Sequence, residues 1–420
     1  MKFGCYVHIP FCNGEKCPYC GFYSEPYLPY LADEYIQSLL EQARRSNFPI
    51  SDTLYIGGGT PSCLPIKQLS ELITALRRIL PLTDTPEITI EINPDNVDDN
   101  FADAIEESGV SRVSLGVQSL VSRQLMVLGR KHSKEKAIEA FYTLKKGHFS
   151  TSIDLIFGIP GQEIGEWEMT IEKAIELDPD HISTYCLSFE EGTPFAYALR
   201  KGLISSVGAK LDSEMFYIAV EKLTNAGFNH YEISNFAKPG EESRHNKKYW
   251  IGDGYIGLGA AAHSYIPGPP RWIRMSNIRS TRGYIKRIDT AENPWDFLET
   301  LDLPKRSAEF LMLRLRLIDG FTIEDIATQL PEIDANKYLE LLRPLESFGK
   351  LVVLDKHIKI PHERLFISDS IILDAVIATD DYIRRIALRK NGIKEDIDTI
   401  DYVKEFHYPD NSGSQNKILR

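Results

Sequence analysis

The stretch HIPFCNGEKCPYCGF, from His8 to Phe22, contains three cysteines within nine residues and directly follows a short apolar run. A structural zinc site needs four ligands, and disulfides need an even number of cysteines. The three residues Cys12, Cys17 and Cys20 satisfy neither requirement alone. Thiolates are also the usual ligands of iron–sulfur clusters. Three of them fit a [4Fe-4S] cluster whose fourth iron stays open to a small molecule. Zinc bound by these cysteines and His8, or a purely structural role for the thiols, are the alternatives.

The composition is typical of a globular protein. Of 420 residues, 43% are hydrophobic and 26% are charged, and six are cysteine. No apolar run is long enough to span a bilayer, and the start MKFGCYVHIPFC lacks the apolar core of a secretory signal. We therefore predict a cytoplasmic location and no transmembrane segment. In a reducing compartment, clustered cysteines bind metal or carry out redox chemistry rather than form disulfides.

The first 240 residues alternate between strand and helix patterns, which predicts an α/β fold with a parallel sheet covered by helices. Six such units fit either a partial TIM-type barrel or an open doubly wound sheet, and in both the active site lies at the carboxyl ends of the strands. The predicted strands are 3–9, 53–56, 87–92, 112–117, 151–157 and 181–188, and the predicted helices are 33–46, 66–80, 98–108, 134–146, 166–177 and 209–226.

From about residue 294 the pattern changes to three short helices and a hairpin, which suggests a winged-helix-like module. Its third helix carries acidic and basic residues, and the whole chain has a net charge of −12. Nucleic-acid binding needs a basic surface, so we predict a packing module and no nucleic-acid partner. The predicted domains are 1–240 for the strand–helix core, 241–293 for a connecting segment, 294–376 for the C-terminal helical domain and 377–420 for a polar tail.

Polar residues and glycines gather where the predicted strands end. The second strand runs into GGGTPS, at 57–62, whose glycines allow a ligand to approach the backbone and offer free N–H groups. Its spacing is neither that of a Rossmann motif nor that of a P-loop. Glu91 and Asp154 are carboxylates among apolar residues, and Gln118 and Arg130 follow the fourth strand. A buried carboxylate is costly unless it is paired, so these residues predict a polar ligand. Structural carboxylates and a simple tight turn are the alternatives.

Several motifs occur in a fixed order over most of residues 3–370: YVHIPFC with CPYCGF, YIGGGTPS, EINPDNV, RVSLGVQS, LGRKHS, DLIFGIPGQ, YCLSFEEGTPF and YEISNFAKPGEESRHNKKYW. Together they resemble the oxygen-independent coproporphyrinogen III oxidase family of radical S-adenosylmethionine (SAM) proteins. The resemblance implies a partial TIM-type (βα)6 radical SAM barrel with a small C-terminal helical domain. It also implies a [4Fe-4S] cluster held by Cys12, Cys17 and Cys20, and bound SAM.

The resemblance also assigns SAM contacts to particular residues. Gly58, Gly59 and Thr60 match positions that bind the methionine end of SAM. The remaining matched positions contact SAM or a second nucleotide, and they are Tyr6, Tyr19, Glu91, Gln118, Arg130 and Asp154.

The chain departs from the family pattern at three places. The cysteine spacing is CxxxxCxxC, one residue longer than the family's CxxxCxxC, and we expect the loop to absorb the extra residue. Phe22 occupies the position where the oxidase has a further cysteine. The motif GLGAAAHS, at 257–264, has alanines at Ala260 and Ala261 where the family pattern is Gly-Pro-Gly-Ala-His-Ser.

Phe22 and the early start of the first strand resemble the HemW-type heme-chaperone branch of this family. In that branch a His–Asn–x–x–Tyr–Trp stretch is implicated in heme binding, which here implies His245, Asn246, Tyr249 and Trp250. The implied function is a heme carrier that hands heme to acceptor proteins, with respiratory proteins and a membrane surface as candidate partners. The alternatives are an enzyme, oxygen-independent coproporphyrinogen III oxidase, and a zinc-stabilised regulator with a winged helix. The alternative to heme contact is that His245 caps a loop and Trp250 packs in the core.

Overall fold

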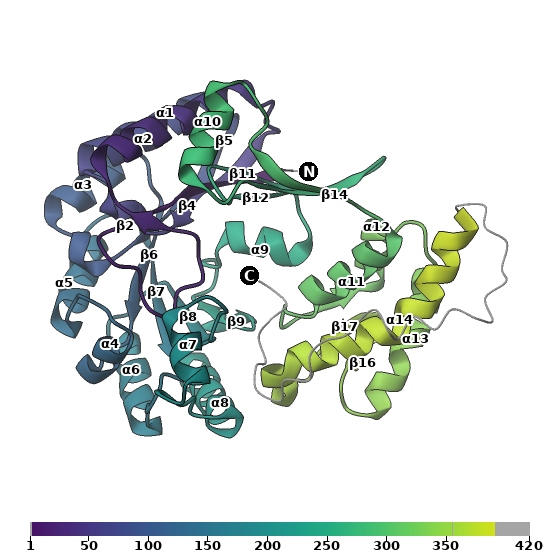
Figure 1. Ribbon diagram of the computed structural model, residues 1–420. Helices are drawn as coiled ribbons and strands as arrows, with labels where there is room; N and C mark the ends of the chain where they lie inside the picture. The colour runs from purple at the N-terminus through teal and green to yellow at the C-terminus, as the bar shows by residue number, and fades with distance from the viewer. Residues whose placement is uncertain (1, 355, 391–420) are drawn as a thin grey trace. The chain divides into compact units, whose positions relative to one another are not determined.

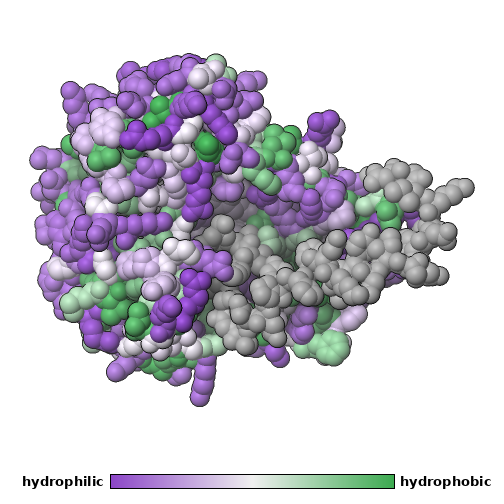
Figure 2. Space-filling view, in the orientation of Figure 1, coloured by the Kyte–Doolittle hydropathy of each residue, from purple (hydrophilic) through white to green (hydrophobic). Residues whose placement is uncertain are grey.

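The computed structural model describes residues 2–354 and 356–390 (Figure 1). The chain divides into two compact units, Met1–Thr300 and Leu301–Arg420. No helix in the described ranges is both long enough and apolar enough to cross a membrane. The exposed side of the first unit that Figure 2 shows is mostly hydrophilic, with small scattered hydrophobic areas. The apolar side chains are therefore concentrated between the sheet and the helices that cover it.

The first unit is built on one twelve-stranded sheet, in the order β14-β13-β12-β11-β1-β4-β5-β6-β7-β8-β10-β9. Its centre is six parallel strands that neighbour one another in sequence order, without the reversal that marks a doubly wound sheet. The sheet is therefore a partial, open TIM-type barrel, and the predicted fold class is confirmed. The six strands are β1 (Phe3–Ile9), β4 (Ser51–Gly58), β5 (Leu82–Ile92), β6 (Arg112–Gln118), β7 (Ser150–Phe157) and β8 (His181–Cys186).

Helices cover the outer face of the barrel, as the teal and purple ribbons in Figure 1 show. Each carries an apolar stripe at intervals of three and four residues, and in α2 the buried stripe is Leu69, Leu72, Ile73 and Leu76. The six predicted helices are confirmed to within a few residues. They are α1 (Pro29–Arg45), α2 (Ile66–Ile79), α3 (Asp99–Glu107), α5 (Lys134–Lys145), α6 (Ile164–Glu176) and α8 (Ala209–Asn225), with the short α4 (Ser122–Val127) and α7 (Pro194–Arg200) between them.

The segment after the sixth unit extends the sheet at both edges. Beyond β8 lie β10 (Asn235–Ala237) and β9 (Asn229–Glu232), which are antiparallel. On the other side β11 (Tyr255–Leu258) pairs parallel with β1, and β12 (His263–Ile266) and β13 (Trp272–Asn277) follow in antiparallel order. The predicted connecting segment is thus part of the barrel wall. It also contains α9 (Arg244–Ile251) and α10 (Thr281–Asp289). The edge strand β14 (Trp295–Leu301) lies within 294–376, where we predicted the C-terminal helical domain, although it belongs to the twelve-stranded sheet.

Short elements shape the loops at the carboxyl end of the barrel. The cysteine loop leaves from β2 (Phe11–Cys12), which pairs with β3 (Glu25–Pro26) and so closes the loop between them. Single turns of 3-10 helix follow two of the parallel strands, η1 (Pro61–Cys63) after β4 and η2 (Pro94–Asn96) after β5.

The second unit contains the three predicted helices and the predicted hairpin. They are α11 (Leu303–Arg314), α12 (Ile323–Gln329), α13 (Ala335–Ser347), β16 (Val352–Leu354) and β17 (His357–Lys359), with β15 (Phe321–Thr322) completing a small sheet. After η3 (His362–Ile367), α14 (Ser368–Lys390) packs against α11 and α13. This helix runs through residue 377, where we predicted a polar tail, and the rest of that tail, 391–420, lies outside the described residues.

Candidate functional site

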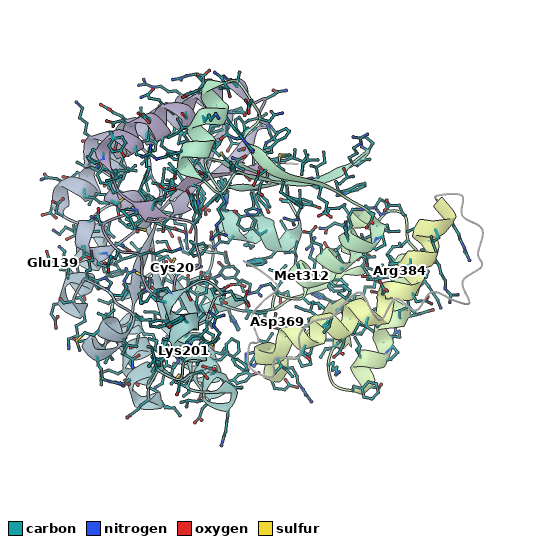
Figure 3. The ribbon with its side chains drawn as sticks, viewed as in Figure 1. Cys20, Glu139, Lys201, Met312, Asp369 and Arg384 are labelled. Carbon is teal, nitrogen blue, oxygen red and sulfur yellow. The ribbon has the colours of Figure 1, made fainter. Side chains whose placement is uncertain are left out.

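The three cysteines of the loop each have a hydrogen-bond donor at the sulfur atom. Thr60 Oγ1 donates to Cys12 Sγ over 3.7 Å, and Arg130 Nη1 donates to Cys17 Sγ over 3.6 Å. Burial raises the pKa of Cys20, while the backbone N–H of Phe22 and the charge of Lys16 act in the opposite direction. Figure 3 places Cys20 on the inner side of the curved sheet, away from Glu139 on the outer helix α5.

This donor set fits an iron–sulfur cluster, because donors at the sulfur atoms stabilise thiolate ligands and tune the cluster that they hold. His8, the predicted fourth ligand of the zinc alternative, is occupied elsewhere. Its Nε2 bonds the carbonyl of Tyr23 and its Nδ1 bonds the hydroxyl of Tyr6, both over 2.9 Å. His8 is 4% exposed and ties the cysteine loop to the first strand. Within residues 2–354 and 356–390, no three His, Cys, Asp or Glu side chains converge on the place of a single ion.

The extra residue of the CxxxxCxxC spacing is absorbed by a turn at Gly14. Gly14 has a φ of +80°, in the left-handed region that glycine adopts at little cost. A Cβ atom there would lie 2.7 Å from Lys131 Nζ, which donates to the carbonyl of Asn13 over 3.0 Å. Arg130 and Lys131 therefore hold the cysteine loop from two consecutive positions.

The glycine turn at the end of β4, residues 57–59, packs against the start of the cysteine loop. A Cβ on Gly59 would lie 2.5 Å from the carbonyl oxygen of Phe11, and one on Gly58 would lie 2.6 Å from the ring of His8. The N–H groups of Gly58, Gly59 and Thr60 donate to Glu91, Ile9 and Phe11 respectively. The expectation of free N–H groups at this turn is wrong, because these three are bound within the protein, by Glu91 of β5, Ile9 of β1 and Phe11 at the start of the cysteine loop. Thr60 instead contributes its side-chain hydroxyl, which donates to Cys12 Sγ.

Two of the predicted carboxylates lie on the inner face of the barrel. Glu91 accepts from Tyr55 Oη over 2.8 Å and from Gly58 N over 3.1 Å. Burial raises its pKa to about 7, and the negative charge of Asp154 acts in the same direction. Asp154 accepts from Ser114 Oγ over 2.9 Å, and burial raises its pKa as well. Tyr6 stacks on Tyr55 with 6.1 Å between ring centroids, so these predicted residues gather in one polar interior.

Arg130 links the cysteine loop to the ends of β5 and β6. Its Nη2 atom donates to Asn93 Oδ1 over 2.8 Å and to the carbonyl of Gly116 over 3.0 Å. Tyr19 hydrogen-bonds Arg130, and its ring packs against Phe195 at 6.2 Å. Gln118 ends β6 with a φ of +65°. Asn93, which also bonds Thr60, was missed by sequence reasoning, although it directly follows the end of β5, two residues after Glu91, where site residues were expected.

The predicted heme-binding residues lie at the other end of the barrel. His245, in α9, contacts Thr53 and Gly4, which stand at the amino ends of β4 and β1. Its Nδ1 bonds Thr53 Oγ1 and its Nε2 bonds Tyr249 Oη, both over 2.8 Å. His245 is 1% exposed, and burial followed by the charge of Lys248 lowers its pKa to about 3. Both of its ring nitrogens are therefore engaged inside the protein.

The other members of this set share the same helix. The backbone N–H of Asn246 bonds Ser243, the N-cap residue of α9, over 3.3 Å, and Trp250 is half-buried one residue before the helix ends. The structure thus separates the predicted heme residues from the cysteine loop, and the predicted heme contact at α9 stays a prediction.

The partial parallel barrel, with three donor-supported cysteines at its carboxyl end, defines a radical SAM protein, and residues 6–174 match the Radical SAM superfamily. A heme chaperone HemW from Lactococcus lactis is 36% identical over 320 residues, covering 76% of this chain and 83% of that protein. HemW from Bacillus subtilis is 31% identical over 364 residues, covering 85% and 95%. The chain belongs to the HemW family of radical SAM proteins. The solved structure of coproporphyrinogen III oxidase (HemN) from Escherichia coli has the same fold, with a TM-score of 0.76, 25% identity, and coverage of 91% of this chain and 90% of that one.

Proposed function

We propose that this protein is a heme chaperone: it binds heme and transfers it to acceptor proteins, and it carries a SAM-binding [4Fe-4S] cluster. The observation that supports this most is that relatives named heme chaperone HemW align over three quarters or more of the chain at 31–36% identity. Phe22, which stands where the oxidase branch has a cysteine, supports the same branch. It is 54% exposed beside the cysteine loop.

Cys12, Cys17 and Cys20 would hold the cluster, with Thr60 and Arg130 as donors to two of the sulfur atoms. The cluster would supply an open iron for the polar end of SAM. Glu91 and Asp154 would accept hydrogen bonds from the hydroxyl or ammonium groups of that ligand, and Tyr6, Tyr19 and Gln118 would line the same interior. Gly58 and Gly59 would flank the methionine end of SAM, with their N–H groups bonded to Glu91 and Ile9.

Oxygen-independent coproporphyrinogen III oxidase is the second candidate, and the shared fold with the E. coli enzyme supports it. That reaction would require the cluster and SAM to remove carboxyl groups from a porphyrinogen. Phe22 argues against it.

The cell compartment and partners follow from the carrier role. We infer a cytoplasmic protein that meets heme acceptors, including respiratory ones, and that associates at most peripherally with membranes. The net charge of −12 argues against nucleic acid as a partner.

The test is a hemin titration of the anaerobically purified, cluster-reconstituted chain, followed by absorption spectroscopy. The matched control is a variant in which Cys12, Cys17 and Cys20 are all alanine. We expect saturable heme binding by the wild type, and iron and sulfide for one [4Fe-4S] cluster per chain that the control lacks. A wild-type chain that takes up the cluster but binds no heme would refute the carrier role.

A further inference from the structure

His263 is an exposed histidine at the mouth of the barrel. It begins β12, directly after the turn that follows β11, and its Cα pairs with that of Ser276. Because β11 runs parallel to β1, this turn lies at the same end of the sheet as the cysteine loop. Tyr265, two residues further on, packs against Tyr255, which in turn contacts Tyr249 inside the barrel. Side chains two apart share one face of a strand, so His263 faces the concave side.

The ring of His263 is chemically available. In the part of the chain that the structure describes, neither ring nitrogen has a hydrogen-bond or ion-pair partner. His8 and His245 differ, since both ring nitrogens of each are held by protein groups. Partial burial and the charges of Arg274 and Arg279 hold the pKa of His263 below its usual value. The ring is therefore neutral near pH 7, which is the form of imidazole that binds a metal ion.

Two guanidinium groups stand around this histidine. Arg274 donates to Tyr255 Oη over 2.8 Å and lies 4.5 Å from the ring centre of Tyr265. Arg279 is exposed, donates to the carbonyl of Gly21 over 3.1 Å and lies over the ring of Tyr23 at 5.9 Å. The bond to Gly21 joins the turn after β13 to the cysteine loop. The acidic side chains at this place are Glu25, which accepts a hydrogen bond from Tyr23, and Glu190, which packs against Gly21.

Aromatic surface completes the surroundings. Phe22 and Tyr23 follow Gly21 directly, and Phe22 is 54% exposed. Phe22 stands in the chain between the two residues that Arg279 contacts, and a large exposed aromatic side chain at such a place marks a candidate contact surface. We call these five residues, His263, Arg274, Arg279, Phe22 and Tyr23, the His263 patch.

We propose that heme docks on the His263 patch, with the His263 imidazole as an iron ligand and the two arginines as partners of the propionates. The occupant is argued from its chemistry: an iron porphyrin has a flat apolar ring, two carboxylates and an iron with axial positions for nitrogen. The patch offers aromatic surface, two cations and one open imidazole. This inference rests on the proposed carrier function, because it names the place where the cargo binds.

The proposal separates two histidines that sequence motifs alone do not separate. His245 is locked between Thr53 and Tyr249 and fixes α9 to β4. Iron could reach it only after both bonds were broken. His263 needs no such opening. Mutation of His263 should therefore remove an iron ligand, whereas mutation of His245 should destabilise the fold.

The experiment is a hemin titration of the reconstituted full chain, comparing wild type with His263→Ala and His245→Ala. We expect His263→Ala to weaken heme binding at least tenfold, to shift the Soret band and to remove the iron–histidine signature in resonance Raman spectra. Added imidazole should restore that signature. His148→Ala is the matched control, because His148 is an exposed histidine paired with Glu106 on an outer loop, and it should leave binding unchanged.

The propionate contact is tested with hemin dimethyl ester, which lacks the carboxylates. Arg279→Gln should weaken hemin binding severalfold and leave binding of the ester unchanged. Equal losses for both ligands would contradict an ionic contact at Arg279.

Thermal melts exclude simple misfolding, and His263→Gln serves as a second variant that keeps polarity without offering an imidazole. Unchanged heme affinity and spectrum in both His263 variants would overturn this inference while the carrier function stands. Loss of the iron–histidine signature in His245→Ala, at a temperature where that variant is still folded, would overturn it too. A wild-type chain that binds no hemin would instead overturn the proposed function on which the inference depends.

Discussion

Arg130 joins the cysteine loop to the barrel, because its Nη1 atom donates to Cys17 Sγ over 3.6 Å while its Nη2 atom binds the carbonyl of Gly116. The guanidinium is buried, and although burial opposes the charged form, the neighbouring Tyr19 and Cys17 raise its pKa. A permanent positive charge thus lies beside one proposed cluster ligand.

Replacing Arg130 with methionine should make the cluster harder to reduce. Reduction adds negative charge, and the variant lacks the donor and the cation that stabilise it. A loss of about 1 kcal/mol in this stabilisation corresponds to roughly 40 mV for one electron. We expect a shift of this order to more negative potential in an EPR-monitored redox titration. Arg130→Lys keeps the charge and should shift less, whereas identical potentials in all three proteins would show that Arg130 does not act on the cluster.

Lys131 should matter only because the cysteine loop is one residue longer than CxxxCxxC. Lys131→Met removes the bond to the Asn13 carbonyl, so the wild-type loop should lose its cluster faster in air. Deletion of Gly14 restores the shorter spacing, and in that background Lys131→Met should have little further effect. Iron retention after timed exposure to air measures all four proteins. An equal effect of Lys131→Met in both backgrounds would contradict this coupling.

Glu91 should make the cofactor-free protein less stable as the pH rises. Its pKa is raised from 4.5 to about 7, so the folded state holds a proton that the unfolded state releases. The stabilisation is therefore complete below about pH 4.5 and is lost as the pH rises through 7, with a total of roughly 3 kcal/mol. Glu91→Gln cannot ionise and should not show this loss. Thermal melts between pH 5 and pH 8 test the difference, and parallel curves for the two proteins would contradict it.

His245→Ala should destabilise the barrel. The change removes two buried hydrogen bonds and the stacking on Tyr55, whose ring centre is 5.0 Å away. Losses of this kind cost about 2–4 kcal/mol. Chemical unfolding should show this decrease in the free energy of unfolding, and the exposed control His148→Ala should stay within about 0.5 kcal/mol of wild type. A His245→Ala protein as stable as wild type would mean that α9 is not anchored by this ring.

The strand–helix core was predictable because its signals are local. Strand β1 and helix α2 each show one clear period, and their predicted and observed bounds almost coincide. The extra wall strands escaped prediction, since β11 and β12 have only four residues each and join the barrel through β1, which is far from β11 in the sequence. The length and hydrophobic period of a segment do not indicate which distant strand it pairs with.

The sequence indicated which residue types form the site, but not the end of the barrel at which each side chain lies. Glu91 and Asp154 interact inside the barrel, and Arg130 bonds residues at the ends of β5 and β6, because parallel strands bring their ends together. The imidazole of His245 is also a possible ligand, but α9 places it at the amino end of the barrel. No local feature of the sequence indicates that position. His263 was passed over inside GLGAAAHS, although a histidine at the first position of a strand after a turn is a detectable signal.

The measurement that tests the central claim most directly offers coproporphyrinogen III, SAM and a reductant to the anaerobic, cluster-loaded protein and compares the products with hemin retention by the same preparation. A heme carrier should retain hemin stoichiometrically after gel filtration and form no protoporphyrinogen. Formation of protoporphyrinogen together with loss of hemin on the column would contradict the account and identify the chain as an oxidase.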